Sequence, residues 1–352
     1  MKIMKRQKAV LLAIAAILCC AALAVAVLFL MPSRKEGSSS DDDLVIYSPH
    51  PMDMTDYIVR EFRQRTGIRV KVISGGTGDL IDKVRKQADG VMADLFWGGG
   101  IESLETIKDQ FQEYRSSEQS EIVDVYTSSH NLWSPFSVLP VVIIYNTKLV
   151  SGKLVPGSWS SLLDPYFKDH LIMADPATSG SAFTILVTML RTMSEGKGGK
   201  ADAWPFVGRF ITQLGPGGFV PGSTTVYNSV AEGEFFGGIT FENSALSLKK
   251  AGKDIDYRYP SEGTSAVPDG IALLKQAPHP EKAKRFIDFV LGHDVQSILM
   301  SKWFRRSVRK DVPAYQPDLS RLNIIDYPIS ESAAMRSQIL SHWTELRSQS
   351  RP

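Results

Sequence analysis

Cysteine is almost absent from this sequence. The chain has 352 residues and two cysteines, Cys19 and Cys20, which both lie in one apolar segment near the N-terminus. The rest of the chain therefore has no disulfide, no zinc–thiolate site and no cysteine nucleophile. Six histidines are scattered along the chain, and the HExxH, GxSxG and GxxxxGK[ST] patterns do not occur. We therefore expect neither an enzyme nor a bound cofactor or metal.

An excess of charge of one sign is also missing. The chain has 40 Lys and Arg against 38 Asp and Glu, and four of the basic residues lie within positions 1–8. Without these four, 36 basic residues face 38 acidic ones, so the body of the chain is close to neutral. This balance gives no reason to expect a nucleic acid as partner.

One long apolar run, Ala9–Met31, follows the basic segment 1–8. It can span a bilayer, which needs about 20 residues, and it is long for a cleaved signal peptide. We expect an uncleaved anchor, with residues 1–8 in the cytoplasm and the body outside. A cleaved signal sequence is the alternative, because Ala24-Val25-Ala26 fits a cleavage site. Residues 32–43 are rich in Ser and Asp and are predicted to form a polar linker.

Short apolar runs alternate with amphipathic stretches from residue 44 onward. This alternation is typical of parallel sheets flanked by helices, and it restarts after residue 146, so we expect two α/β units joined by more than one strand. The predicted strands are 44–47, 68–73, 93–97, 138–145, 171–173, 237–241 and 265–275. The predicted helices are 52–66, 79–88, 159–163, 182–193, 206–214, 225–232, 280–291, 295–304 and 332–347.

Small hydrogen-bonding residues gather at four points where a helix is predicted to begin. The four loops are Ser74–Asp79, Gly98–Gly100, Thr178–Ser181 and Gly222–Thr225. A helix N-terminus offers unpaired N–H groups and a partial positive charge, and hydroxyl groups add donors. Several such ends at the carboxyl ends of strands would bind an oxyanion. Taken singly, each loop is more readily explained as an ordinary helix cap.

Three further features each have two interpretations. Trp97 either stacks on a sugar face or fills the core at the end of a strand. Glu242 ends an apolar strand, where a carboxylate lies either at the crevice or at a solvated strand end. The basic cluster Arg305–Lys310 is more readily interpreted as a solvated face than as a phosphate contact.

Six segments of the sequence resemble one known family, the periplasmic solute-binding proteins of the ferric-ion and organophosphate ABC-importer group. The resemblance extends from Val45 to about Val312. The segments are Val45–Pro51, Ala93–Gly100, Leu139–Asn146, Asp175–Ser181, Glu262–Gly270 and Phe304–Arg309.

This resemblance implies an α/β fold of the type-2 periplasmic-binding-protein class. Such a fold has two lobes, a ligand cleft between them and two crossing strands, which 138–146 and 265–271 match. It implies that 44–140 forms the first part of lobe 1 and 141–266 forms lobe 2. Residues 267–352 would then return to lobe 1 and add the C-terminal helices.

The resemblance also bears on the ligand. Ferric-ion members carry two adjacent tyrosines just before the helix that corresponds to 225–232, but Ser223–Tyr227 reads STTVY and the chain has no Tyr-Tyr pair. The WGGG segment and the Thr-Phe-Glu strand look more like the hexose-phosphate and phosphonate binders. The resemblance thus implies a small anionic solute. N–H and hydroxyl groups would bind its phosphate, and His50 and Glu242 would bind its sugar hydroxyls. The implied ligand-binding residues are Ser48, His50, Thr77, Gly78, Gly99, Ser179, Gly180, Ser181, Ser223, Thr224 and Glu242.

The implied partners are this solute and the permease subunits of an ABC importer in the membrane. We expect a monomer in the periplasm or another extracytoplasmic space, tethered by residues 9–31. Two alternatives stay open: a ferric-iron-binding component of an iron importer, and a ligand-sensing subunit of a membrane receptor.

Overall fold

The computed structural model describes residues 42–86, 93–194 and 202–350. The expected basic segment 1–8, the expected anchor 9–31 and the linker as far as residue 41 lie outside the described residues. Among the residues that are described, no helix is both long and apolar enough to cross a membrane.

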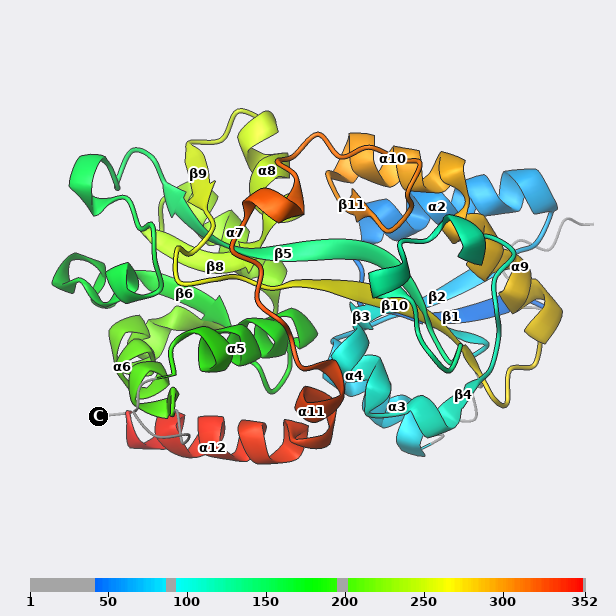
Figure 1. Cartoon of the computed structure of the whole chain (residues 1–352), viewed down its shortest axis with the longest axis horizontal. Coiled ribbons are helices and arrows are strands. Elements are labelled where there is room, and N and C mark those ends of the chain that lie inside the picture. Colours follow the sequence, from blue (N-terminus) through cyan, green and yellow to red (C-terminus); the bar gives the residue numbers. More distant parts are fainter. Residues whose placement is uncertain (1–41, 87–92, 195–201, 351–352) are drawn as a thin grey trace, which may run out of the picture. The chain divides into compact units, whose positions relative to one another are not determined.

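The first lobe is a sheet with the strand order β2-β1-β3-β10, covered by helices (Figure 1). Strand β1 pairs in parallel with β2 and β3, and β10 pairs antiparallel with β3. Its strands are β1 (Leu44–Ser48), β2 (Val70–Ser74), β3 (Leu95–Gly100), β4 (Phe111–Gln112), β10 (Ala266–Leu274) and β11 (Arg306–Ser307). Its helices are α2 (Met52–Thr66), α3 (Thr77–Lys86), α4 (Ile101–Glu105), α9 (Pro280–Leu291) and α10 (His293–Trp303).

The apolar residues of α2 show how sequence spacing builds this lobe. Met54, Ile58 and Phe62 recur at intervals of four, and all three are buried in one core with strand residues such as Leu95. The helix ends at Thr66 and is capped by Gly67, whose φ of 74° lies in the left-handed region that glycine adopts without strain.

The second lobe continues from β5 in the strand order β5-β8-β6-β7. Strand β6 pairs in parallel with β7 and β8, whereas β8 and β9 pair antiparallel with β5. Its strands are β5 (Ser134–Asn146), β6 (Leu171–Ala174), β7 (Phe219–Val220), β8 (Gly237–Phe241) and β9 (Ile255–Arg258). Its helices are α5 (Gly180–Thr192), α6 (Trp204–Leu214), α7 (Ser223–Glu232) and α8 (Glu242–Lys250).

Two strands belong to both lobes. Strand β5 is buried throughout; Phe136 and Val138 pack in the first core, and 141–145 pack in the second. Strand β10 runs antiparallel beside it, with Ala266 opposite Pro140, and Figure 1 shows the two strands side by side. The predicted boundaries at 140–141 and 266–267 therefore fall inside these strands.

The C-terminal residues return to the second lobe. The sequence predicted one helix over 332–347, but the structure breaks it at Met335 into α11 (Ile329–Ala334) and α12 (Arg336–Gln349). Helix α11 packs against α4 of the first lobe. Helix α12 buries Ile339 and Trp343 in the core of the second lobe.

Candidate functional site

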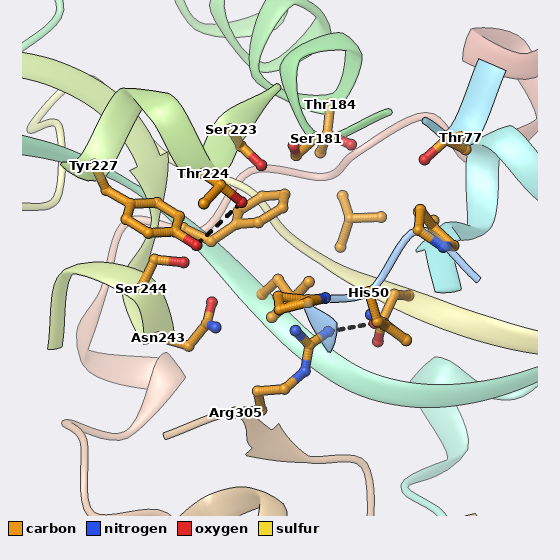
Figure 2. A pocket seen from close by; sticks show the side chains of 18 of the residues that line it. His50, Thr77, Ser181, Thr184, Ser223, Thr224, Tyr227, Asn243, Ser244 and Arg305 are labelled. Atoms are coloured by element: carbon orange, nitrogen blue, oxygen red, sulfur yellow. Dashed lines mark hydrogen bonds and ion pairs between the residues drawn. The ribbon is translucent and has the colours of Figure 1, made fainter. Parts of the chain in front are cut away.

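A pocket of about 570 Å³ lies between the two lobes. Its volume falls within the range of about 300–1,000 Å³ that small-molecule sites occupy. The first lobe contributes residues such as His50 and Thr77, and the second contributes Ser181, Ser223 and Thr224 (Figure 2). A small solute in this pocket would therefore contact both lobes.

Five helices begin at this pocket, and Met52–Asp53 open the first of them, α2. Thr77 is the first residue of α3, Ser181 is the second of α5, and Ser223 and Thr224 open α7. The second and third residues of α8, Asn243–Ser244, complete the set. Each helix has nine or more residues, so each adds partial positive charge at its N-terminus. The arrangement favours an anion.

Not all of these N-termini are closed by a cap. The Ser179 hydroxyl accepts a hydrogen bond from the N–H of Ala182 at 3.3 Å and caps α5. By contrast, Pro51 before α2, Gly222 before α7 and Phe241 before α8 form no side-chain cap. The first N–H groups of α7 and α8 are therefore left without a side-chain acceptor, and a bound oxyanion would supply one.

One guanidinium group, Arg305, lies in the pocket wall. Its Nε donates to the Ser137 hydroxyl at 2.9 Å, and Nη2 donates to the Asp269 carboxylate. Nη1 takes no part in either hydrogen bond. The pocket also contains the carboxylate of Asp53, which accepts a hydrogen bond from the Trp303 indole at 2.8 Å. With one cation and two carboxylates among the side chains, anion binding depends on N–H and hydroxyl donors rather than on net charge.

His50 contributes a neutral ring to the pocket wall. Burial, aided by the nearby Arg305 cation, holds the pKa of His50 well below its usual value. Its Nε2 lies 3.5 Å from a carboxylate oxygen of Asp269, and the ring packs edge-on against Trp97. His50 therefore adds no positive charge to the pocket at neutral pH.

Six of the eleven predicted ligand-binding residues line the pocket, and five do not. Those that line it are His50, Thr77, Gly99, Ser181, Ser223 and Thr224. Two of the others have structural hydrogen bonds instead. The Ser48 hydroxyl donates to the carbonyl of Trp97 at 2.7 Å, and Ser179 caps α5.

Gly78 and Gly180 do not line the pocket but let the two lobes touch. A Cβ on Gly180 would lie 2.7 Å from the Thr77 hydroxyl oxygen across the interface. A Cβ on Gly76 would lie 3.0 Å from the carbonyl oxygen of Thr178, and one on Gly78 would lie 3.4 Å from that of Ala177. Glycine at these positions thus allows the two lobes to approach each other closely.

Glu242, which was expected to contact the solute, does not line the pocket. Its side chain is fully buried and accepts hydrogen bonds from Arg306 Nε at 2.7 Å and Nη2 at 2.8 Å. The Tyr259 hydroxyl donates a third hydrogen bond to it. A carboxylate buried in this way needs such partners, which sequence cannot assign. The residues that follow it, Asn243–Ser244, lie in the pocket instead.

The interpretation of Arg305–Lys310 as a solvated face is also wrong. Arg305, Arg306 and Arg309 are each 4–6% exposed, and all three form ion pairs with carboxylates. Trp97 is fully buried and packs against Phe136 and Phe286, so it fills the core of the first lobe.

Sequence reasoning missed seven polar side chains in the pocket: Asp53, Thr184, Tyr227, Asn243, Ser244, Asp269 and Arg305. The Tyr227 hydroxyl donates to Thr224 at 3.3 Å, and burial raises its pKa. Among the described residues, no group of three His, Cys, Asp or Glu side chains is placed to hold a metal ion.

Two lobes that share crossing strands and hold a polar pocket between them define a protein that binds a small solute. The chain belongs to the bacterial extracellular solute-binding proteins, a family that matches residues 102–332. It is therefore a binding protein rather than an enzyme.

Solved structures of periplasmic binding proteins share the fold. AfuA from Actinobacillus pleuropneumoniae, solved with exogenous fructose 6-phosphate bound, is 24% identical, with a TM-score of 0.80 over 88% of this chain and 99% of AfuA. Iron-bound HitA from Pseudomonas aeruginosa is 20% identical, with a TM-score of 0.73 over 86% of this chain and 99% of HitA. The predicted fold class is thereby confirmed.

A related sequence comes from Haemophilus influenzae. This uncharacterized protein is 23% identical over 320 residues, which cover 86% of this chain and 90% of that protein. The match thus extends over most of both chains.

Proposed function

We propose that this protein is the solute-binding component of an ABC importer and that it captures a small organophosphate, such as a sugar phosphate, outside the cytoplasm. The observation that carries the proposal is the meeting of five helix N-termini in one pocket, three of them without a side-chain cap. Oxyanions bind well at such ends. The solute would then pass to permease subunits in the membrane.

Each part of a sugar phosphate finds a chemical complement in the pocket. The hydroxyls of Ser223 and Thr224, with the N–H groups of the first turn of α7, would hold the phosphate. Arg305 would add one charged donor through Nη1. The Asn243 amide and the Ser244 hydroxyl would bond sugar hydroxyls, and the apolar side chain of Phe241 would contact the sugar ring.

A sugar phosphate should raise the melting temperature of the protein, whereas the free sugar should not. A ligand that binds only the folded state adds about 2.7 kcal/mol at 100 times its Kd. The measurement is a thermal-shift series with hexose phosphates, phosphonates, inorganic phosphate and free hexoses. Equal shifts with fructose and fructose 6-phosphate would count against a phosphate site.

A matched pair of variants assigns the shift to the pocket. The double variant Ser223→Ala, Thr224→Val should lose most of the stabilisation by fructose 6-phosphate. The variant Thr212→Val should keep it, because the exposed Thr212 hydroxyl, within the described part of the chain, bonds only the carbonyl of Gly208 on its own helix α6.

Ferric iron is the second candidate, because Tyr227 and His50 line the same pocket. Ferric citrate should nevertheless produce no visible tyrosinate-to-iron absorbance. One tyrosine is available in the pocket, and burial raises its pKa, which opposes the phenolate form that iron requires. A coloured complex that disappears in Tyr227→Phe would establish the iron site instead.

A further inference from the structure

A buried hydrogen bond joins the two lobes behind the ligand pocket. Glu102 lies on α4 of the first lobe and is fully buried, and Thr184 lies on α5 of the second. The Thr184 oxygen is 2.7 Å from Oε1 of Glu102. Thr184 also lines the pocket, and so does Gly100, against which the Glu102 carboxylate packs. The contact therefore touches both the solute site and the lobe interface.

A count of hydrogens at Thr184 indicates the charge state of Glu102. The Thr184 oxygen lies within hydrogen-bond distance of two acceptors, Glu102 Oε1 at 2.7 Å and the carbonyl of Gly180 at 3.2 Å. Its hydroxyl has one hydrogen, so an ionised Glu102 leaves one of the two bonds unmade. A protonated Glu102 donates to Thr184, which then donates to Gly180, and both bonds form.

The second carboxyl oxygen of Glu102 supports the same assignment. Oε2 is buried and has no hydrogen-bond partner among the described residues. A buried ionised carboxylate with an unpaired oxygen is costly, whereas the carbonyl oxygen of a neutral carboxyl group costs much less.

We propose that Glu102 is a positioning residue of the pocket and acts in its protonated form. In this form it orients Thr184 and holds the two lobes together, so that closure of the lobes takes up a proton. The inference rests on the proposed function only where it links closure to solute capture.

Charged and titratable groups face Glu102 from the C-terminal residues. Arg336 of α12 stacks over the Phe183 ring at 4.1 Å, and Tyr327 precedes α11. Burial raises the pKa of Glu102; the hydrogen bonds with Thr184 and with its own backbone, and then the Arg336 cation, oppose this with smaller effects. Burial also raises the pKa of Tyr327, which stays neutral. The neutral form of Glu102 is thus favoured where the lobes meet.

The sign of the pH dependence follows from this burial. When the lobes separate, Glu102 meets water and regains its ordinary pKa, so the closed state binds more protons than the open one. The ratio of closed to open protein is then highest below that ordinary pKa. It falls as the pH rises through the raised pKa, by up to about tenfold per pH unit.

Spin labels on the two lobes can test this directly. The exposed residues Asp56 of α2 and Thr212 of α6 are suitable sites for cysteine. The background is the full chain with Cys19→Ser and Cys20→Ser. The interlobe distance is measured from pH 5.5 to 8.5, without solute and with fructose 6-phosphate. The closed fraction of the labelled wild-type background should fall as the pH rises.

Three variants in this background distinguish a positioning role of Glu102 from a general contribution to the stability of the protein. Glu102→Gln donates an amide hydrogen to Thr184 at every pH, so its closed fraction should not change with pH. Thr184→Val cannot form the bond, so its closed fraction should be lower than that of the wild type at every pH, but it should still fall as the pH rises because Glu102 stays buried in the closed state. Glu105→Gln is the matched control: Glu105 is a buried residue of the same helix, and its partners His130 and Trp133 belong to the first lobe. It should follow the wild type.

A wild type without pH dependence, or a Glu102→Gln variant that follows the wild type, would overturn the proposal. Both of these outcomes are judged from the measurements without solute. Failure of fructose 6-phosphate to change the distance at any pH would count against the proposed function instead.

Discussion

Replacing Arg306 with methionine should lower the free energy of unfolding by about 3–5 kcal/mol. Arg306 of β11 belongs to the first lobe, and it donates two hydrogen bonds to Glu242 of α8 in the second. Methionine keeps much of the side-chain volume but leaves a fully buried carboxylate without its cation. Denaturation with urea at pH 7 measures the loss.

Two further variants test this explanation. The double variant Arg306→Met, Glu242→Leu should recover most of the stability, since removing both partners of a buried pair is often nearly neutral. Lys310→Met breaks an exposed pair with Asp124 and should change stability by less than about 1 kcal/mol. If Arg306→Met lowers the free energy of unfolding by no more than Lys310→Met does, the pair between the lobes is unimportant for stability.

Gly180→Ala should weaken solute binding by about 5- to 150-fold, with little change in the melting temperature of the solute-free protein. The added Cβ would lie 2.7 Å from the hydroxyl oxygen and 3.0 Å from the Cβ of Thr77 in the opposite lobe. Overpacking of this kind costs about 1–3 kcal/mol, and the closed arrangement alone bears that cost. Titration calorimetry with fructose 6-phosphate gives the affinity.

A second glycine provides the control for this prediction. Gly208 lies inside α6, where an added Cβ meets nothing within 4 Å. Gly208→Ala should therefore keep the affinity and raise the stability by up to about 1 kcal/mol, because alanine favours the helix. Equal affinity in both variants would show that the contact between Gly180 and Thr77 does not govern binding.

The long helices and strands could be predicted because their apolar spacing is regular. Helix α2 begins and ends where the sequence placed it, at 52–66, and so does α9 at 280–291. Helix α8 was missed, because it starts directly at the end of β8 with no turn residue and buries only Glu242 and Ala245. A helix with so few buried positions has little periodic signal.

The site was predictable only in part, for a reason that the arginines illustrate. Hydroxyl and glycine residues before helices pointed to the pocket, because strand ends and helix starts meet there. A sequence does not show which carboxylate faces which cation after folding. The sequence therefore indicated a solvated cluster, although Arg305 and Arg306 each meet an acidic partner in the interior and the buried Arg309 pairs with the half-buried Glu118.

The place of α12 has a consequence for the order in which the chain can fold. The first lobe needs 267–308 to complete its sheet and core, and the second needs Trp343 to fill its own. Neither core can therefore form fully from an uninterrupted stretch of chain, so the last helix completes the assembly.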